Sequence, residues 1–398
     1  MSGQDIYRKS VELHRKYQGK LGVESLVPVK DKEDLSWAYT PGVAEPCRVI
    51  AKDPQQSFNL TMRGRTMAVI SDGSAVLGLG NIGPEAAMPV MEGKALLMKE
   101  FAGVDCVPLV IDTQDTQEII TFVRQVAPSF AGINLEDISA PRCFEVEEAL
   151  QDLDIAVFHD DQHGTAIVVT AALHNAAKVV GKKFEDLTVV VVGAGAAGIA
   201  ISKMLLALDG PVAGYTKVDG LRSVRDLVMV DSKGAVANDR ADLNPYKKQL
   251  AIYGNIENKK GSLADVLAGA DVVIGVSGPD LISAEMVSSM ADKAIVMAMA
   301  NPQPEILPDV ATKAGAAVVA TGRSDFPNQI NNVLAFPAVF KAVRDGRLSE
   351  ITLEMKVAAA EALAGLVVHP TADKIIPDPF DDQVVPVVSK AILKVASN

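Results

Sequence analysis

A run of β-branched residues that ends in a glycine-rich turn limits most strongly what this chain can fold into. Residues 187–192 read Leu-Thr-Val-Val-Val-Val, and the six residues that follow are Gly193, Ala194, Gly195, Ala196, Ala197 and Gly198. The apolar run predicts a buried strand, and residues 199–208 predict a helix. A strand, a tight glycine turn and a helix in this order are typical of a dinucleotide-binding unit, because the turn and the helix start offer backbone N–H groups to a pyrophosphate. The alternative is a plain strand–helix turn.

Further short apolar segments follow at residues 227–231, 271–276, 294–300 and 317–320, and a helical pattern covers residues 165–180. Strands that alternate with helices predict an α/β fold with a doubly wound parallel sheet. Residues before about 160 mix helical stretches with short strands. We therefore expect an N-terminal α/β domain over residues 1–160 and a Rossmann-type dinucleotide-binding domain over residues 161–398, whose C-terminal helices pack back. Within the first domain, residues 66–70 and 75–79 predict a β-hairpin with residues 71–74 as its turn.

Composition narrows the class of protein and its partners. The chain has 398 residues, which favours two domains, and its 50 acidic residues exceed its 38 basic ones, for a net charge of −12. Such an acidic chain is a poor partner for nucleic acid or an anionic membrane. Its three cysteines are widely spaced, which argues against a disulfide framework, and no apolar signal core or membrane-length apolar run is present. We expect a cytoplasmic protein.

The acidic residue that ends the next predicted strand after the glycine turn bears on the cofactor. Asp231 ends the apolar segment at residues 227–231 and is placed to hydrogen-bond the ribose 2′-OH of NAD and to repel the 2′-phosphate of NADP. Its spacing from the glycines is long, because residues 210–225 look like an insertion, and Ser232 and Lys233 soften the repulsion. NAD is expected, with NADP as the alternative.

The first glycine motif in chain order, Gly78-Leu-Gly80-Asn-Ile-Gly83, precedes the second one at residues 193–198 and follows the predicted hairpin strand. This is the wrong topology for a dinucleotide site. Two interpretations stay open for this segment: a loop on the substrate side, or simple close packing.

One lysine lies on the apolar face of a predicted helix. Residues 84–101 predict this helix, and at about 100° per residue Val90, Leu97 and Phe101 share one stripe with Lys94 at its centre. A lysine there either extends to an edge of the core or serves a function. Burial lowers a lysine pKa, which would let Lys94 act as a general base near neutral pH.

Carboxylates gather at the ends of two further predicted strands. Glu136 and Asp137 follow one strand, and Asp160 and Asp161 follow the other. Three carboxylates from two strand ends suit Mg²⁺ or Mn²⁺. Two alternatives remain open: a zinc site that uses His159 and His163, and capping of the following helix by Asp161 or Thr165. Tyr39 lies in a proline-rich turn and by itself predicts only a packed aromatic side chain.

In order along nearly the whole chain, eight segments resemble motifs of the malic enzyme family in its short bacterial form. They occupy residues 39–44, 78–84, 91–95, 133–138, 158–166, 193–198, 300–305 and 322–333. Each is weak alone, but eight in register are specific. The resemblance implies oxidative decarboxylation of (S)-malate to pyruvate and CO₂, with NAD, a divalent Mg²⁺ or Mn²⁺ ion, and a homodimer or larger homo-oligomer.

The same resemblance assigns roles to individual residues. It implies a general base at Lys94, a general acid at Tyr39 and a less sharply defined catalytic acidic position at Asp160. It implies metal ligands at Glu136, Asp137 and Asp161. It implies substrate contacts at Asn301 and Asn331, with Asn332 adjacent and sharing the role.

This chain departs from the family pattern at three positions. Asn81 replaces a usual Asp, Ala338 replaces a usual Gly, and Ala75 stands where the long eukaryotic forms carry a substrate-binding Arg. The substrate carboxylate would then be held by Ser74 or by backbone N–H groups. Two other functions stay open: a malolactic conversion that retains NAD and releases lactate, and a nucleotide-sensing protein with an inactive site, which Asn81 suggests.

Overall fold

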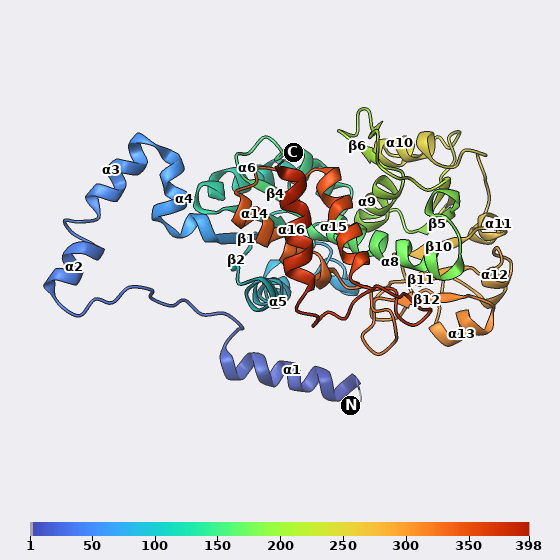
Figure 1. Ribbon diagram of the computed structural model, residues 1–398, viewed down its shortest axis with the longest axis horizontal. Helices are drawn as coiled ribbons and strands as arrows, with labels where there is room; N and C mark the ends of the chain where they lie inside the picture. Colours follow the sequence, from blue (N-terminus) through green and yellow to red (C-terminus); the bar gives the residue numbers. More distant parts are fainter. Residues whose placement is uncertain (1–2, 398) are drawn as a thin grey trace.

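Two parallel β-sheets, joined by helices, form the body of the molecule (Figure 1). The structure is a computed structural model that describes residues 3–397. The first sheet has the order β2 (Asp105–Val110), β1 (Thr66–Ser71), β3 (Gly132–Leu135) and β4 (Ala156–His159), and all its strands are parallel. It confirms an α/β N-terminal half.

The hairpin predicted over residues 66–79 is wrong. β1 pairs with β2 on one edge and β3 on the other, so no edge is free for a returning strand. Beyond β1 the chain turns instead, because Asp72 Oδ1 accepts the backbone N–H of Ser74 at 2.9 Å, and Leu77–Leu79 form one 3₁₀ turn. This turn leads directly into helix α5 (Pro84–Ala102).

The second sheet is the expected Rossmann-type sheet. Its strands are parallel except for the short edge strand β9, and its order is β12 (Val318–Thr321), β11 (Ile295–Ala298), β10 (Val272–Gly275), β5 (Thr188–Val192), β8 (Asp226–Asp231) and β9 (Gly234–Ala235). All five residues of β5 are buried, as expected for a central parallel strand with helices on both faces. Between helix α9 (Ala196–Leu205) and strand β8, the chain forms a small antiparallel ribbon of β6 (Leu208–Asp209) and β7 (Thr216–Lys217).

Helices cover both sheets and fill the space between them. The remaining helices are α1 (Gly3–Tyr17), α2 (Lys32–Ala38), α3 (Ala44–Lys52), α4 (Ser57–Leu60), α6 (Thr116–Val126), α7 (Arg142–Glu148), α8 (Thr165–Val180), α9 (Ala196–Leu205), α10 (Pro245–Tyr253), α11 (Leu263–Leu267), α12 (Ala284–Ser288), α13 (Pro308–Lys313), α14 (Phe336–Gly346), α15 (Leu353–Gly365) and α16 (Val384–Ala396). None of the helices within residues 3–397 is long and apolar enough to cross a membrane.

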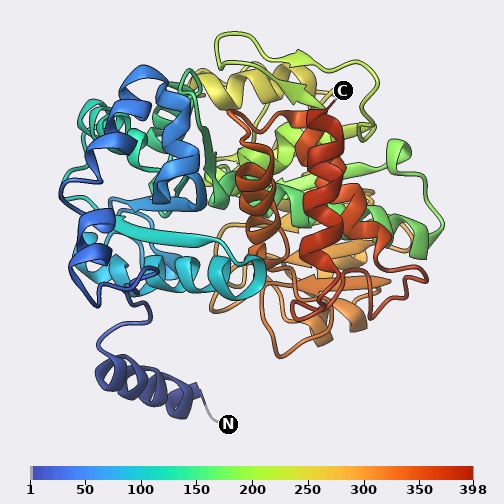
Figure 2. The same ribbon diagram turned by 60° about the vertical axis from the view of Figure 1, so that its left-hand side comes forward.

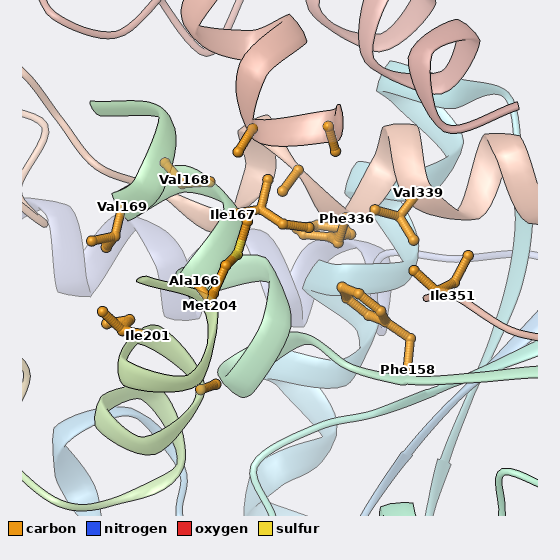
Figure 3. Close-up of a cluster of buried hydrophobic side chains, with 14 of the residues drawn as sticks. Phe158, Ala166, Ile167, Val168, Val169, Ile201, Met204, Phe336, Val339 and Ile351 are labelled. Carbon is orange, nitrogen blue, oxygen red and sulfur yellow. The ribbon is translucent and has the colours of Figure 1, made fainter. Parts of the chain in front are cut away.

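One hydrophobic core spans the junction between the two sheets. Phe158 of β4 meets Phe340 of α14 edge to face, with ring centroids 5.8 Å apart. Figure 3 shows Phe158 and Phe336 in the same cluster as Ile167 of α8 and Met204 of α9. We call each sheet with the helices that cover it a lobe. Helix α14 therefore packs onto the first lobe, although it follows the strands of the second lobe in the sequence.

The N-terminal arm (residues 3–52) extends away from this body in Figure 1, and Figure 2 shows its helix α1 apart from the body. No described residue of α2 or α3 is buried, and most of the large exposed hydrophobic side chains of the structure belong to the arm, Trp37 among them. The arm touches the body at Lys20, whose Nζ donates to the carbonyl oxygen of Pro89 at 2.6 Å. An apolar arm that its own chain leaves exposed calls for a partner surface.

Candidate active site

Helix α5 places Lys94 against the carboxylates at the ends of β3 and β4. Its ammonium lies 2.9 Å from Glu136 Oε1 and also donates to Asp160 Oδ2. The ring of Phe336 covers it, with Nζ 4.7 Å from the ring centroid. Lys94 on the apolar stripe of α5 therefore lies in a buried polar pocket and does not extend to an exposed edge of the core.

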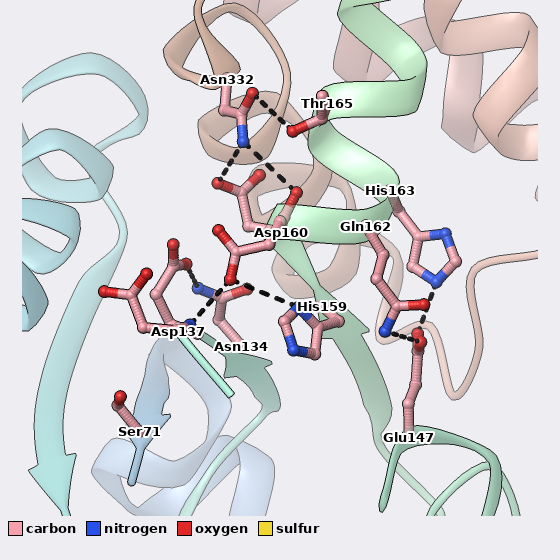
Figure 4. Close-up of polar contacts among 12 residues, drawn as sticks. Ser71, Asn134, Asp137, Glu147, His159, Asp160, Gln162, His163, Thr165 and Asn332 are labelled. Carbon is pink, nitrogen blue, oxygen red and sulfur yellow. Dashed lines mark hydrogen bonds and ion pairs between the residues drawn. The ribbon is translucent and has the colours of Figure 1, made fainter. Parts of the chain in front are cut away.

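A single turn of π-helix, Asp160–Gly164, follows β4 and points its first two side chains into this pocket (Figure 4). Asn332 holds the turn from the second lobe, because its Nδ2 donates to Asp160 Oδ2 at 3.2 Å while its Oδ1 accepts from Thr165 at 3.1 Å. Helix α8 begins at Thr165 with Gly164 as its N-cap and no side-chain cap. The alternative that Asp161 or Thr165 caps this helix is therefore wrong.

Three carboxylates converge beside the turn. Glu136, Asp137 and Asp161 each offer an oxygen within 4.8 Å of the others. Asp161 Oδ2 accepts the backbone N–H of Asp137 at 2.7 Å, and Asn134 Nδ2 donates to Glu136 at 2.7 Å. Within the described residues this cluster contains no histidine, so the zinc alternative finds no support here.

The charges of the pocket favour a divalent cation. Four carboxylates, those of Glu136, Asp137, Asp160 and Asp161, face the single ammonium of Lys94. Burial raises the pKa of Glu136 well above its usual range, and burial raises that of Asp160 as well. Hard oxygen donors with an excess of negative charge fit Mg²⁺ or Mn²⁺.

The pKa expected for Lys94 needs correction. Burial does act to lower it, but Asp160, Glu136 and Asp161 outweigh burial and hold the Lys94 pKa well above its usual value. The reason is that the sequence shows the apolar stripe but not the three carboxylates that fold against it. In this structure Lys94 is therefore protonated at neutral pH.

Glu147, which the sequence analysis missed, anchors the other side of the π turn. Its carboxylate accepts from Gln162 Nε2 at 2.9 Å and lies 2.6 Å from His163 Nε2 (Figure 4). The nearby His163 outweighs burial and lowers the Glu147 pKa to about 2. His163 is thus engaged away from the carboxylate cluster, and Glu147 fixes the turn that presents Asp161.

Ser74 lies next to the cluster, with its hydroxyl fully used inside the protein. It donates to Asp72 Oδ1 at 2.6 Å and accepts from the backbone N–H of Ser139 and from Arg142, both at 2.9 Å. Arg142 also pairs with Asp72 at 2.8 Å, and its Nε has no partner among the described residues. Sequence reasoning overlooked Arg142, although it is a cation five residues beyond Asp137.

The candidate substrate residues of the second lobe lie across from these groups. A Cβ on Gly78 would meet the carbonyl oxygen of Asn301 at 2.5 Å, so the first glycine motif packs closely on the opposite lobe. Asn331 Oδ1 accepts the N–H of Val333 at 3.0 Å and so caps its own turn. Asn332 is the asparagine that contacts Asp160.

Two positions that depart from the family pattern have defined surroundings. Asn81 exchanges two side-chain hydrogen bonds with Gln114, at 3.2 and 3.1 Å. Ala338 is fully buried in α14. Neither residue disturbs the carboxylate cluster.

The second glycine motif forms the turn between β5 and α9. Gly193 has a φ of +115°, and a Cβ there would lie 2.7 Å from the carbonyl oxygen of Val276. A Cβ on Gly198 would lie 1.9 Å from the carbonyl oxygen of Gly193. Both positions require glycine, and the turn opens on a cavity of about 850 Å³ that Gly193 and Asp231 help to line.

Two basic side chains and one backbone N–H contact the carboxylate of Asp231. Arg240 Nη1 lies 2.8 Å and Lys247 Nζ 2.7 Å from its carboxylate, and the N–H of Lys233 donates to it at 3.0 Å. These hydrogen bonds outweigh burial and lower the Asp231 pKa to about 2. The site therefore holds an ionised acid with cations within reach.

Tyr39 is the predicted residue that the single chain does not bring to the site. It follows α2 in the arm, and 67% of its surface is exposed.

Comparison with known proteins agrees with this geometry. Residues 18–151 match the family model "Malic enzyme, N-terminal domain", and residues 162–396 match "Malic enzyme, NAD binding domain". The chain belongs to the malic enzyme family. Glu136 and Asp137 lie within the first matched malic enzyme segment, and Asp161 immediately precedes the second.

Individual malic enzymes resemble the chain along nearly its whole length. It is 54% identical to an NAD-dependent malic enzyme of Geobacillus stearothermophilus, over 95% of this chain and 77% of the relative. It is 52% identical to a bifunctional malic/malolactic enzyme of Bacillus subtilis strain 168, over 98% of this chain and 93% of the relative. The crystal structure of an NAD-dependent malic enzyme from Thermotoga maritima is 45% identical, with a TM-score of 0.90 over 96% of this chain and 98% of that one.

Proposed function

We propose that the protein oxidises and decarboxylates malate to pyruvate and CO₂, with NAD as hydride acceptor and Mg²⁺ or Mn²⁺ as metal. The observation that carries this proposal is the position of Lys94, which lies against Glu136 and Asp160 at the ends of two strands. Membership of the family and the glycine turn beside a large cavity support the cofactor. The site would lie at the junction of the two proposed domains, residues 1–160 and residues 161–398.

Each residue type suits the role we propose for it. Lys94, once deprotonated, removes the proton of the C2 hydroxyl, and bound NAD would supply the acceptor for the C2 hydride. Glu136, Asp137 and Asp161 would hold the divalent ion, which supplies a Lewis acid for the C2 oxygen. Loss of CO₂ leaves an enolate, and Tyr39 protonates its C3 carbon to give pyruvate. Asp160 orients Lys94.

On the substrate side, we propose that Asn301 and Asn331 contact malate and that Asn332 shares this role by fixing Asp160. Because the hydroxyl of Ser74 is already saturated, its role is to keep Arg142 in place beside the cluster. The carboxylate of malate would then meet backbone N–H groups or the Arg142 guanidinium.

For Tyr39 to reach the site, the arm must dock on a surface that its own chain does not supply. We infer a homodimer or larger homo-oligomer, in which the arm of one copy packs on the body of another and brings Tyr39 to the partner's pocket. The exposed apolar side chains of the arm support this arrangement.

Asp231 favours NAD, because its carboxylate accepts a ribose 2′-OH and repels a 2′-phosphate. Arg240 and Lys247 weaken that repulsion, which keeps NADP as an alternative cofactor. We further propose a cytoplasmic location, in keeping with three free cysteines.

The test is the absorbance at 340 nm with malate and Mn²⁺, with NAD or NADP, with and without EDTA, while pyruvate and lactate are assayed. We expect NADH and pyruvate in equal amounts, and loss of both with EDTA. Lactate without net NADH would support the malolactic conversion, which the bifunctional Bacillus subtilis relative makes the second candidate. Cofactor binding without any turnover would favour the sensor function instead.

A further inference from the structure

A second cavity, of about 550 Å³, lies apart from the site described above. Its walls come from α7, the π turn, α9, the β6–β7 ribbon, α10 and the start of α15. Neither Lys94, nor the carboxylate cluster, nor the glycine turn lines it. Its volume is in the range of small-molecule sites.

Two lysines reach into this cavity without a carboxylate partner. Lys203 Nζ lies 4.3 Å from the ring centroid of Tyr215, and its nearest acceptor is the Gly210 carbonyl oxygen at 3.5 Å. Lys356 Nζ lies 3.2 Å from His163 Nδ1. Across residues 3–397, neither ammonium has a carboxylate oxygen within 4.0 Å.

The acids that line the cavity are engaged or exposed. Glu147 is committed to Gln162 and His163, while the other lining acids, Glu148, Asp209 and Glu350, are exposed at the rim. Inside the cavity two ammonium groups therefore face one occupied carboxylate. Burial, opposed by Glu147 and helped by Lys203, lowers the pKa of Lys356 to about 8. Buried cations without a counter-ion are costly, so the arrangement calls for an anion.

Aromatic groups give the cavity an apolar wall. The ring of Tyr246 packs against that of Phe144 at a tilt of 42°, with ring centroids 4.5 Å apart, and Tyr215 lies beneath Lys203. Both tyrosines are buried. A ligand that is charged at one end and has a flat or apolar carbon skeleton suits this combination.

We propose that this cavity binds a small organic anion, whose carboxylate or phosphate group lies between the ammonium groups of Lys203 and Lys356 and whose carbon skeleton packs on Tyr215 and Tyr246. The occupant would contact α9, which begins at the glycine turn, and His163 of the π turn that carries Asp161. Binding there is therefore coupled to the binding of cofactor and metal, a consequence that rests on the proposed function.

Titration of the full-length protein with fluorobenzoate, followed by ¹⁹F NMR, and with inorganic phosphate, followed by calorimetry, tests the proposal. We expect saturable binding of at least one probe at one site per chain. Binding should weaken about tenfold or more in Lys203→Gln and in Lys356→Gln, which corresponds to about 1.4 kcal/mol. Lys248→Gln removes an exposed lysine from α10, outside the cavity, and should change binding less than twofold. Fluorobenzoate binding alone would indicate a carboxylate ligand, and phosphate binding alone a phosphate ester.

A second experiment uses only the wild-type protein, so it tests the site even if the lysine variants fold poorly. Lysines are acetylated with limiting acetic anhydride and located by mass spectrometry, with and without the probe. Protection of Lys203 and Lys356, but not of Lys248, supports the site. Absence of saturable binding by either probe, equal binding by all three variants, or no protection of either lysine would overturn it, whatever the outcome of the malate assay.

Discussion

Lys94 Nζ lies 2.9 Å from Glu136 Oε1, so the proposed general base is in contact with a proposed metal ligand. The two residues come from different elements, α5 and the end of β3, and both are largely removed from water. The Lys94 pKa is held high by these carboxylates. A metal ion that neutralises the Glu136 carboxylate would weaken this effect and lower the Lys94 pKa. Metal binding would thus favour deprotonation of the base.

We expect Lys94→Met to lower malate oxidation by about 10²–10⁴-fold, the range for loss of a general base, while NAD affinity changes less than about twofold. The measurement is kcat from NADH formation, together with NAD binding by fluorescence titration. Lys99→Met is the matched control, because Lys99 lies on the exposed face of the same helix and pairs with Asp105 at 2.7 Å. Malate oxidation at the wild-type rate in Lys94→Met would remove Lys94 as the base.

For Tyr39→Phe we expect loss of pyruvate formation by about 10²-fold or more, because the enolate lacks its proton donor. Mixing it with Lys94→Met tests whether Tyr39 acts on a second copy. In a mixed dimer one pocket has both groups intact, so activity should return to about one quarter of wild type for random pairing. If the mixture stays as inactive as its parts, Tyr39 does not act across subunits.

Asp231→Ser should raise the preference for NADP over NAD, measured as the ratio of kcat/KM values, by about 10- to 100-fold, since each factor of ten needs about 1.4 kcal/mol. The substitution removes the carboxylate and leaves Arg240 and Lys247 to meet the 2′-phosphate. Adding Arg240→Gln should abolish most of the gain. An unchanged ratio in Asp231→Ser would show that other residues select the cofactor.

Glu147→Gln should raise the metal concentration that gives half-maximal rate by about 10- to 100-fold, with kcat at saturating metal nearly preserved. The reason is that Glu147 fixes Gln162 and His163 and so orients the turn that carries Asp161. Its exposed neighbour offers a control, Glu148→Gln, which should leave the metal dependence unchanged. A purely structural role would lower thermal stability without altering the metal dependence.

His174 predicts how stability depends on pH. It is buried in α8, stacks on Phe184 with ring centroids 4.2 Å apart, and burial lowers its pKa from 6.5 to about 4. Between these values the unfolded chain binds a proton that the folded chain does not, so this contribution is present above pH 6.5 and lost as the pH falls toward 4. The full shift corresponds to about 3 kcal/mol. Urea unfolding between pH 7 and 5 should therefore show a shallower loss of stability in His174→Gln than in the wild type.

The parallel sheet of the second lobe could be predicted from sequence because its strands are buried on both faces. Such strands appear as continuous apolar runs, and the helix predicted at residues 165–180 coincides with α8 (Thr165–Val180). The first sheet was harder to predict, since β1 looks like one arm of a hairpin until β2 and β3 occupy both its edges. No local pattern contains that long-range pairing.

Within the site, the carboxylate cluster was predictable because its members end adjacent strands and resemble family motifs. The pKa of Lys94 was not, because it depends on acids 42 to 67 positions away in the chain. Glu147 and Arg142 were missed for a related reason: both lie on α7, where charged residues look like an ordinary solvated face. Their partners are visible only once the turns pack together.

Helix α14 follows the second lobe in sequence but belongs to the first in space, since Phe340 packs on Phe158 and Arg344 donates to the carbonyl oxygen of Gly103 at 2.8 Å. The two halves are therefore not interchangeable modules. If the gene were divided at codon 160, the N-terminal product would lack α14, which covers β4. The C-terminal product would expose the apolar face of α14. Exchange of one half between related chains must therefore keep α14 together with the surface of β4 on which it packs.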